Sequence, residues 1–262
     1  MLGRLLCLVA VLLALTGAVA QVRLSSVSSA GLSNTSQWMT ESWTGNTRPY
    51  KRAMSEVRGA IGAARDPAAV VASYKAAAQR NPQDALAQFR WAYSAYRINH
   101  TDPAIRASGE LSQAAQALAS VASPKMYEFA RLRFVLEAMP GGYIYPLKTV
   151  GMRLLKRDPM DKEVKYWLTQ VLDDGPSDQD HQQALSYSQE LTHSKGYEVY
   201  GYQALGWTYF VILGESHRQQ DGDAAIAAYR QAERYAPSDA EFHAGAERLI
   251  HLIQTSQAHM KK

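Results

Sequence analysis

Two segments far apart in this chain share one spacing of residues, and this spacing most constrains the fold. Residues 66–96 read DPAAVVASYKAAAQRNPQDALAQFRWAYSAY, and residues 222–249 read GDAAIAAYRQAERYAPSDAEFHAGAERL. In both, a tyrosine is followed by alanine three positions later and by proline five positions after that, at Tyr74, Ala77 and Pro82 and again at Tyr229, Ala232 and Pro237. Each segment predicts an amphipathic helix, a proline turn and a second helix. A recurring unit of this kind indicates a helical solenoid.

The chain beyond Tyr50 predicts helices almost throughout. Alanine, leucine, glutamine and arginine are abundant and form helices well, and runs that alternate with a period of two are absent. The breaks that close a unit are Pro82, Pro124, Pro159, Gly196 and Pro237, with separations of 42, 35, 37 and 41 residues. With two helices between breaks, the sequence predicts an all-α solenoid of antiparallel helix pairs. We expect four to five units and a C-terminal capping helix at about 239–256.

These residues resemble the tetratricopeptide repeat. The second helix of that repeat carries a small residue, an aromatic residue four positions later, an alanine three further on and a proline five beyond it. This pattern is matched by Ala225, Tyr229, Ala232 and Pro237, and, with a larger first residue, by Val70, Tyr74, Ala77 and Pro82. The first helix of the repeat carries an aromatic residue, a Leu-Gly pair and a tyrosine, here Tyr202, Leu205, Gly206 and Tyr209.

The resemblance covers about residues 66–256 and is weaker in the middle. The spacing without the aromatic residue remains at Leu147, Gly151, Leu154 and Pro159, and a fainter match at Ala184, Ser188 and Leu191. The loop from Gly214 to Gly222 is expected to be several residues longer than the family turn. The resemblance implies a right-handed, tetratricopeptide-like α-solenoid in which the matching residues form the core, because small residues let paired helices approach closely.

The first residues have the features of a secretory signal peptide at residues 1–20. Arg4 precedes an apolar run from Leu5 to Leu15, and Ala18-Val19-Ala20 fits a cleavage site, so we expect cleavage between Ala20 and Gln21. The run is shorter than the roughly 20 residues of a spanning helix. We therefore expect export to the periplasm or outside the cell, without stable membrane insertion after cleavage.

Residues 21–50 are rich in Ser, Thr, Asn and Gly, and predict a flexible leader ahead of a tetratricopeptide-like helical repeat domain at residues 51–262. Trp38 and Trp43 are expected to dock onto the first helices. Alternatively, they form a short recognition segment.

Composition argues against disulfide bonds, thiol catalysis and nucleic-acid binding. The single cysteine, Cys7, lies in the signal peptide, so the mature chain can form no disulfide and cannot use thiol catalysis. Removing Arg4 leaves 27 of the 28 Lys and Arg residues against 24 Asp and Glu residues. Because a nucleic-acid binder usually carries a stronger basic excess, we expect no nucleic-acid partner.

No catalytic motif is evident, and we expect no cofactor or metal. Asp178, Asp180 and His181 match no rigid coordination pattern and predict a solvated helix start. Glu215-Ser216 resembles the catalytic pair of all-α lytic transglycosylases, but the downstream motif of that family is missing, so Glu215 is expected to be an exposed loop residue. The alternative of an all-α cell-wall hydrolase, or its accessory domain, requires a buried carboxyl with a raised pKa in a polar cleft.

By the resemblance, one stripe of each first helix faces a concave groove that holds extended peptides or partner helices. The residues on this stripe are Tyr200, Gln203 and Trp207, with equivalents at Arg90, Tyr93 and Arg97 and at Tyr166, Gln170 and Asp173. Aromatic, Arg and Gln side chains suit a binding surface.

We expect Trp207 and Tyr93 to be at least partly exposed, and Tyr202, Tyr209 and Tyr229 to be buried. The function predicted is a non-enzymatic scaffold that binds a protein or peptide partner. A further alternative is a structural envelope component that self-associates through its repeats.

Overall fold

The computed structural model of the chain describes residues 43–99, 101–139 and 145–260. Within these ranges it contains twelve α-helices and no strand, which confirms the all-α class. The first six are α4 (Arg48–Ala63), α5 (Pro67–Arg80), α6 (Ala85–Ile98), α7 (Pro103–Ala107), α8 (Glu110–Ser120) and α9 (Tyr127–Ala138). The last six are α10 (Tyr145–Arg157), α11 (Lys162–Asp173), α12 (Asp178–Thr192), α13 (Glu198–Ser216), α14 (Gln219–Tyr235) and α15 (Ala240–Met260).

Aspartate side chains start several of these helices. Asp66, Asp84 and Asp102 each accept backbone N–H groups two and three residues later, at distances between 2.8 and 3.3 Å. These bonds satisfy donors that the first turn of a helix leaves free. Pro67 and Pro103 follow two of the caps at the first helical position, where a missing N–H costs nothing. Asp66, Asp84 and Asp102 therefore mark the starts of α5, α6 and α7.

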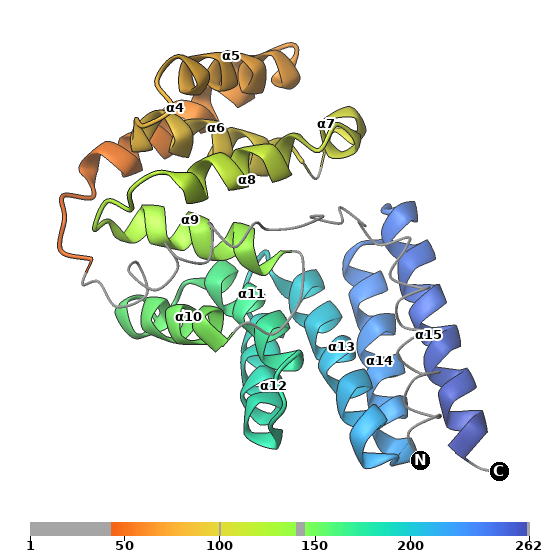
Figure 1. Cartoon of the computed structure of the whole chain (residues 1–262). Coiled ribbons are helices and arrows are strands. Elements are labelled where there is room, and N and C mark those ends of the chain that lie inside the picture. The colour runs from red at the N-terminus through yellow and green to blue at the C-terminus, as the bar shows by residue number, and fades with distance from the viewer. Residues whose placement is uncertain (1–42, 100, 140–144, 261–262) are drawn as a thin grey trace.

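Most helices pack against their neighbours in the chain, and several contact the helix two elements further on. Such contacts join α4 to α6, α9 to α11 and α11 to α13. Figure 1 shows the consequence: the chain follows a curved path from α4 and α5, past α9 and α10, to the three long helices α13, α14 and α15.

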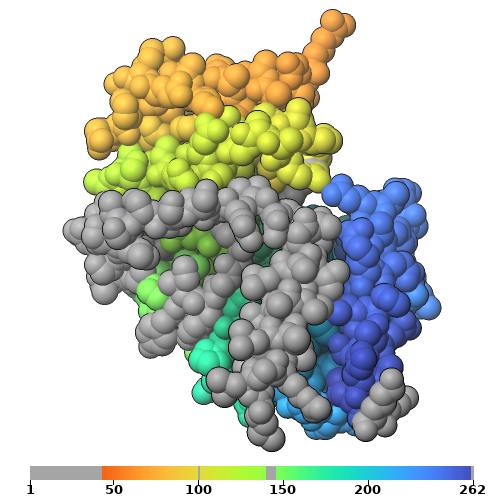
Figure 2. Space-filling view, turned by 45° about the vertical axis from the view of Figure 1, so that its right-hand side comes forward, coloured from red at the N-terminus to blue at the C-terminus, as the bar shows by residue number. Residues whose placement is uncertain are grey.

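The curved path brings α7 and α15 into contact. Arg106 Nη1 on α7 lies 3.0 Å from Glu241 Oε1 at the start of α15, although the two residues are 135 positions apart. Figure 2 shows the yellow-green surface of this region meeting the blue surface of the C-terminal helices. This ion pair joins α7, in the N-terminal half of the chain, to α15, its last helix.

The separation of 42 residues between the breaks at Pro82 and Pro124 has a structural cause. The short helix α7 is inserted between α6 and α8, which lengthens the unit after Pro82.

The prediction of a long loop from Gly214 to Gly222 is wrong, because α13 continues to Ser216 and α14 begins at Gln219. Only two residues join these helices, and the first, His217, adopts the left-handed conformation with φ 54° that reverses the chain.

The residues of the repeat pattern form core contacts in the C-terminal and middle units. Ala225, Tyr229 and Ala232 are buried, as are Leu147, Leu154, Ala184, Ser188 and Leu191. In α5 the pattern matches the core only in part: Tyr74 packs against the core but stays partly exposed, and Val71 and Ala78 are buried in place of Val70 and Ala77. The expectation that Tyr202 and Tyr209 are buried is also wrong, because both remain half-buried on α13.

The expected signal peptide, most of the expected leader and Trp38 lie outside the described residues. The described end of that leader belongs to the folded body, since α4 begins at Arg48 and Tyr50 is buried. Trp43 packs edge-on against Tyr127 of α9, with ring centroids 6.0 Å apart, beneath Arg153 of α10. It therefore docks, as expected, but on α9 and α10 rather than on the first helices.

The buried apolar side chains form two clusters. One extends from Trp43 to Ala184, and the other joins α13, α14 and α15 around Leu213, Tyr229 and Ile250. Several buried polar side chains lie on α11, α12 and α13, three helices that contact one another; they are Thr169, Asp173, Asp180, His181, Ser188, Thr192 and Thr208. We call this set the polar seam.

Candidate functional site

Neighbouring helices α11 and α13 place three tyrosines in one row. The rings of Tyr166 and Tyr200 have centroids 5.5 Å apart, and those of Tyr197 and Tyr200 are 5.6 Å apart. Tyr200 is 44% exposed although its ring contacts two other tyrosine rings. We call Tyr166, Tyr197 and Tyr200 the aromatic row.

The stripe expected on α13 continues from Tyr200 along the helix. Gln203 and Trp207 are both half-buried, and Trp207 contacts Phe210 edge-on at 5.7 Å between centroids. The expected partial exposure of Trp207 is therefore confirmed. Gln170, on α11, which contacts α13, is also half-buried. These side chains combine aromatic faces with amide groups, a composition that suits recognition of a peptide.

The stripe expected on α6 is largely covered. Tyr93 is 5% exposed, so its predicted exposure is wrong. Its ring stacks on Phe89, and its hydroxyl accepts a hydrogen bond from Arg58 of α4 at 3.3 Å. Arg90 pairs with Glu56 of α4 at 3.0 Å, whereas Arg97 is exposed. Tyr93 and Arg90 are covered because α4 packs against the face of α6 that was expected to be open.

Asp173 lies in the polar seam rather than at a surface. It is 3% exposed, and its Oδ2 accepts a hydrogen bond from the Thr208 hydroxyl of α13 at 2.9 Å. Its other oxygen, Oδ1, has no hydrogen-bond partner among the described residues. Burial raises the pKa of Asp173 well above its ordinary value. This carboxyl is enclosed between helices, so it differs from the cleft acid that the hydrolase alternative requires.

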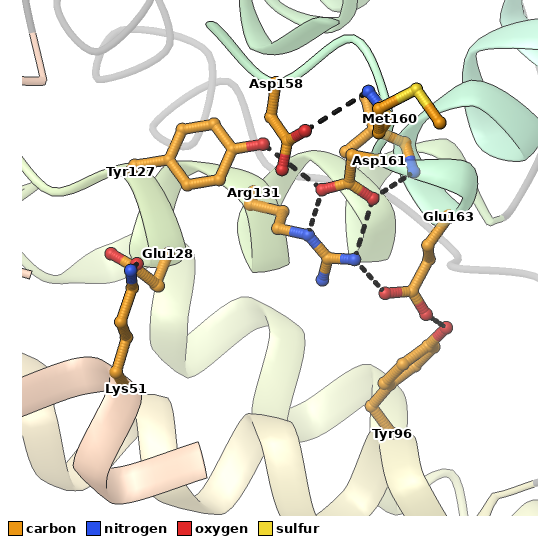
Figure 3. A network of polar contacts seen from close by, with 10 residues as sticks. Lys51, Tyr96, Tyr127, Glu128, Arg131, Asp158, Met160, Asp161 and Glu163 are labelled. Carbon is orange, nitrogen blue, oxygen red and sulfur yellow. Dashed lines mark hydrogen bonds and ion pairs between the residues drawn. The ribbon is translucent and has the colours of Figure 1, made fainter.

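A polar network around Arg131 holds the start of α11, the helix that carries Tyr166 of the aromatic row (Figure 3). Arg131 of α9 contacts Asp161 through Nε and Nη2 at 2.5 and 2.9 Å, and Glu163 through Nη2 at 2.6 Å. Glu163 accepts a hydrogen bond from Tyr96 of α6, and Asp161 accepts one from Tyr127 at 3.2 Å. The network therefore ties α6, α9 and the start of α11 together.

Asp161 has two structural roles in this network. It caps α11 by accepting the Val164 N–H at 3.1 Å, and it is the main partner of Arg131. Burial alone would raise the pKa of Asp161, but the hydrogen bonds and positive charge of Arg131 outweigh burial, so the pKa is lowered. Sequence reasoning missed this network because its members belong to three separate helices and share no local motif.

Two expectations about isolated motifs are wrong. α12 begins at Asp178, which is exposed, but Asp180 and His181 are buried, so the expected solvation fails for these two residues. Glu215 belongs to the last turn of α13 rather than to a loop, although its side chain is half exposed. The two motifs meet in space, since Glu215 Oε2 lies 3.0 Å from His181 Nδ1.

Across residues 43–99, 101–139 and 145–260, no helix is long and apolar enough to cross a membrane. Comparisons with protein-family models, with curated proteins and with solved structures found no match to this chain. The inference of function therefore depends on the geometry of the aromatic row and its surroundings.

Proposed function

We propose that this chain is an exported, tetratricopeptide-like scaffold without catalytic activity, which binds a protein or peptide along the aromatic row and the adjoining Gln203 and Trp207. In this proposal the helices form a right-handed solenoid of antiparallel pairs, and α11 and α13 line its groove. The observation that carries the proposal is the exposed ring of Tyr200, which stands between Tyr166 and Tyr197 on two adjacent helices.

Two packing features support the repeat architecture. Alternate helices contact each other from α9 to α13, as expected when equivalent helices of successive units form one layer. The small residues of the pattern also lie at close helix contacts: a Cβ at Gly151 would lie 2.7 Å from Leu168 Cδ1, and one at Gly206 would lie 2.9 Å from Tyr229 Cε2.

The physical chemistry of the aromatic row supports binding rather than packing alone. A tyrosine has few rotatable bonds and offers both an apolar face and a hydroxyl, so it contributes much contact area at a small cost in side-chain entropy. The partner expected is an extended peptide or an amphipathic helix, because both can lie along a shallow surface formed by two helices.

Export is supported by the sequence of residues 1–20 alone. The positive residue, apolar run and A-x-A site have the order that secretory signals require. Chain export would be measured by fractionating cells that express the full chain and by sequencing the N-terminus of the exported product. Retention of an uncleaved chain in the cytoplasm would contradict this part of the proposal.

Binding can be tested by selecting peptides from a random display library on the immobilised full chain. Selected peptides would then be titrated against three variants: Tyr200→Ala, Trp207→Ala and the control Tyr235→Ala. Tyr235 is 52% exposed on α14, outside the aromatic row. We expect the first two variants to weaken binding about tenfold or more, because exposed aromatic anchors dominate such interfaces, and the control to bind as the wild type does.

Other outcomes would identify a different function. Peptides that bind all three variants equally would place the binding surface elsewhere. Concentration-dependent sedimentation of the wild type that Tyr200→Ala abolishes would favour the self-associating structural component. Release of soluble fragments from purified cell wall would favour the hydrolase alternative.

A further inference from the structure

His181, Asp178 and Glu215 form a cluster at the edge of the polar seam, where α12 begins and α13 ends. One ligand atom from each residue, the imidazole nitrogen and two carboxylate oxygens, lies within 4.8 Å of the other two. His181 is 2% exposed and fixed, whereas Asp178 and Glu215 are exposed and reach the same point from two helices.

A hydrogen bond to the backbone sets the tautomer of His181. Its Nε2 lies 3.0 Å from the carbonyl oxygen of Gly175. Because a carbonyl oxygen only accepts, Nε2 carries a proton, so Nδ1 is the nitrogen with a lone pair whenever the ring holds one proton. A backbone carbonyl on the far nitrogen is the arrangement that orients imidazole ligands in metal sites.

Nδ1 of His181 faces a carboxylate. Glu215 Oε2 lies 3.0 Å from Nδ1, yet Nδ1 makes no hydrogen bond of acceptable geometry with any described residue. Two acceptors at this distance repel each other unless a positive species lies beside both. That species is either a second proton on the ring or a metal cation. Asp178 favours the cation, because its carboxylate adds a third acceptor that one proton cannot satisfy.

The geometry points to a divalent transition-metal site formed by His181 Nδ1 and the carboxylates of Asp178 and Glu215. Imidazole nitrogen with carboxylate oxygen suits Zn²⁺ and its first-row neighbours better than Mg²⁺ or Ca²⁺, which prefer oxygen ligands alone. Two carboxylates and a neutral imidazole balance the charge of a divalent ion. Three protein ligands also leave a coordination position open to water.

The dipoles of α12 and α13 have opposite effects on a cation at this site. Glu215 lies in the last turn of α13, where the helix dipole favours a cation, and Asp178 is the first residue of α12, where the dipole opposes one. These effects offset each other, so the two carboxylates determine the charge of the site. A bound ion would connect α12 to α13 across the polar seam.

The site can be tested with Zn²⁺ and untagged full chain by isothermal titration calorimetry. We expect one Zn²⁺ per chain, a raised melting temperature, and affinity reduced at least about tenfold in Glu215→Gln and in Asp178→Asn. Matched controls are Glu190→Gln, whose side chain is as exposed as that of Glu215, and His251→Gln, which replaces an exposed histidine on α15. Both controls should bind Zn²⁺ as the wild type does.

Long-range ¹H–¹⁵N spectra of the histidine rings separate the metal from the proton without requiring a variant to fold. We expect the Nδ1 resonance of His181 to shift on addition of Zn²⁺ while Nε2 keeps its proton. A ring protonated on both nitrogens and unaffected by Zn²⁺ would identify an ion pair with Glu215 and overturn the metal site. Stoichiometric binding that Glu215→Gln and Asp178→Asn leave unchanged would also overturn it.

Discussion

The ring of Tyr229 on α14 lies against Gly206 on α13. A Cβ atom at position 206 would be 2.9 Å from Tyr229 Cε2 and 3.0 Å from two further ring atoms. Tyr229 is 1% exposed, so its ring has little space into which it could move. Glycine at 206 therefore allows the close approach of α13 and α14, and the aromatic ring fills the space between them.

Gly206→Ala is expected to destabilise the protein. Alanine would favour the helix by about 1 kcal/mol, but the clash costs about 1–3 kcal/mol. Because three atoms of the buried Tyr229 ring lie within 3.0 Å, we expect the upper part of that range and a net loss of up to about 2 kcal/mol. Gly214→Ala in the same helix is the matched control, because its Cβ would meet no atom of the described residues within 4 Å. That variant should be more stable than the wild type. Urea unfolding of both variants measures the difference, and equal midpoints would contradict this account.

Ala232→Leu tests the same interface from α14. Ala232 is fully buried, and a larger side chain would overpack the contact at a cost of about 1–3 kcal/mol. Ala227→Leu, on the exposed side of α14, should change the free energy of unfolding by less than about 0.5 kcal/mol. A neutral Ala232→Leu in thermal or urea unfolding would mean that the register of this helix pair is wrong.

Asp161→Asn is expected to cost about 3 kcal/mol. It removes one of the two carboxylates that pair with the largely buried Arg131 and leaves only Glu163, and a buried charge that loses a partner is costly. The double variant Arg131→Met with Asp161→Asn should lose less than the sum of the two single losses, since it removes both charges. Urea unfolding of the three variants gives the coupling energy, and additive losses would show that the two side chains act independently.

Stability should decrease with rising pH because of Asp173. Its pKa is raised in the folded state by burial, so the folded chain holds a proton that the unfolded chain releases above about pH 4. The stabilising contribution is complete below the unfolded pKa and is lost as pH rises through the folded pKa. Asp173→Asn should therefore flatten the pH dependence of urea unfolding between about pH 4 and pH 7.

The exposed Asp158 provides the control for this measurement. Asp158→Asn should keep the slope of the wild type, because this side chain lies at the surface ahead of α11. If the profiles of wild type and Asp173→Asn run parallel over the same pH range, Asp173 does not bind a proton on folding.

The sequence by itself determined the helices, most of their ends and the core of the C-terminal unit. Asp66 and Asp102 mark helix starts by bonds to residues two and three positions away, which is a local property. The burial of Tyr229 and Ala232 follows from a period of 3.6 residues, which places them on one face. Such features depend only on neighbours in the chain.

Only the tertiary structure decided which faces are covered and which distant side chains meet. The same 3.6-residue period places Tyr93 on one face of α6. It does not reveal that α4 covers this face. The pairing of Arg106 with Glu241, and the meeting of His181 with Glu215, depend on crossing angles that accumulate over many helices. Local propensity does not specify those angles, because they result from how every intervening pair of side-chain surfaces packs together.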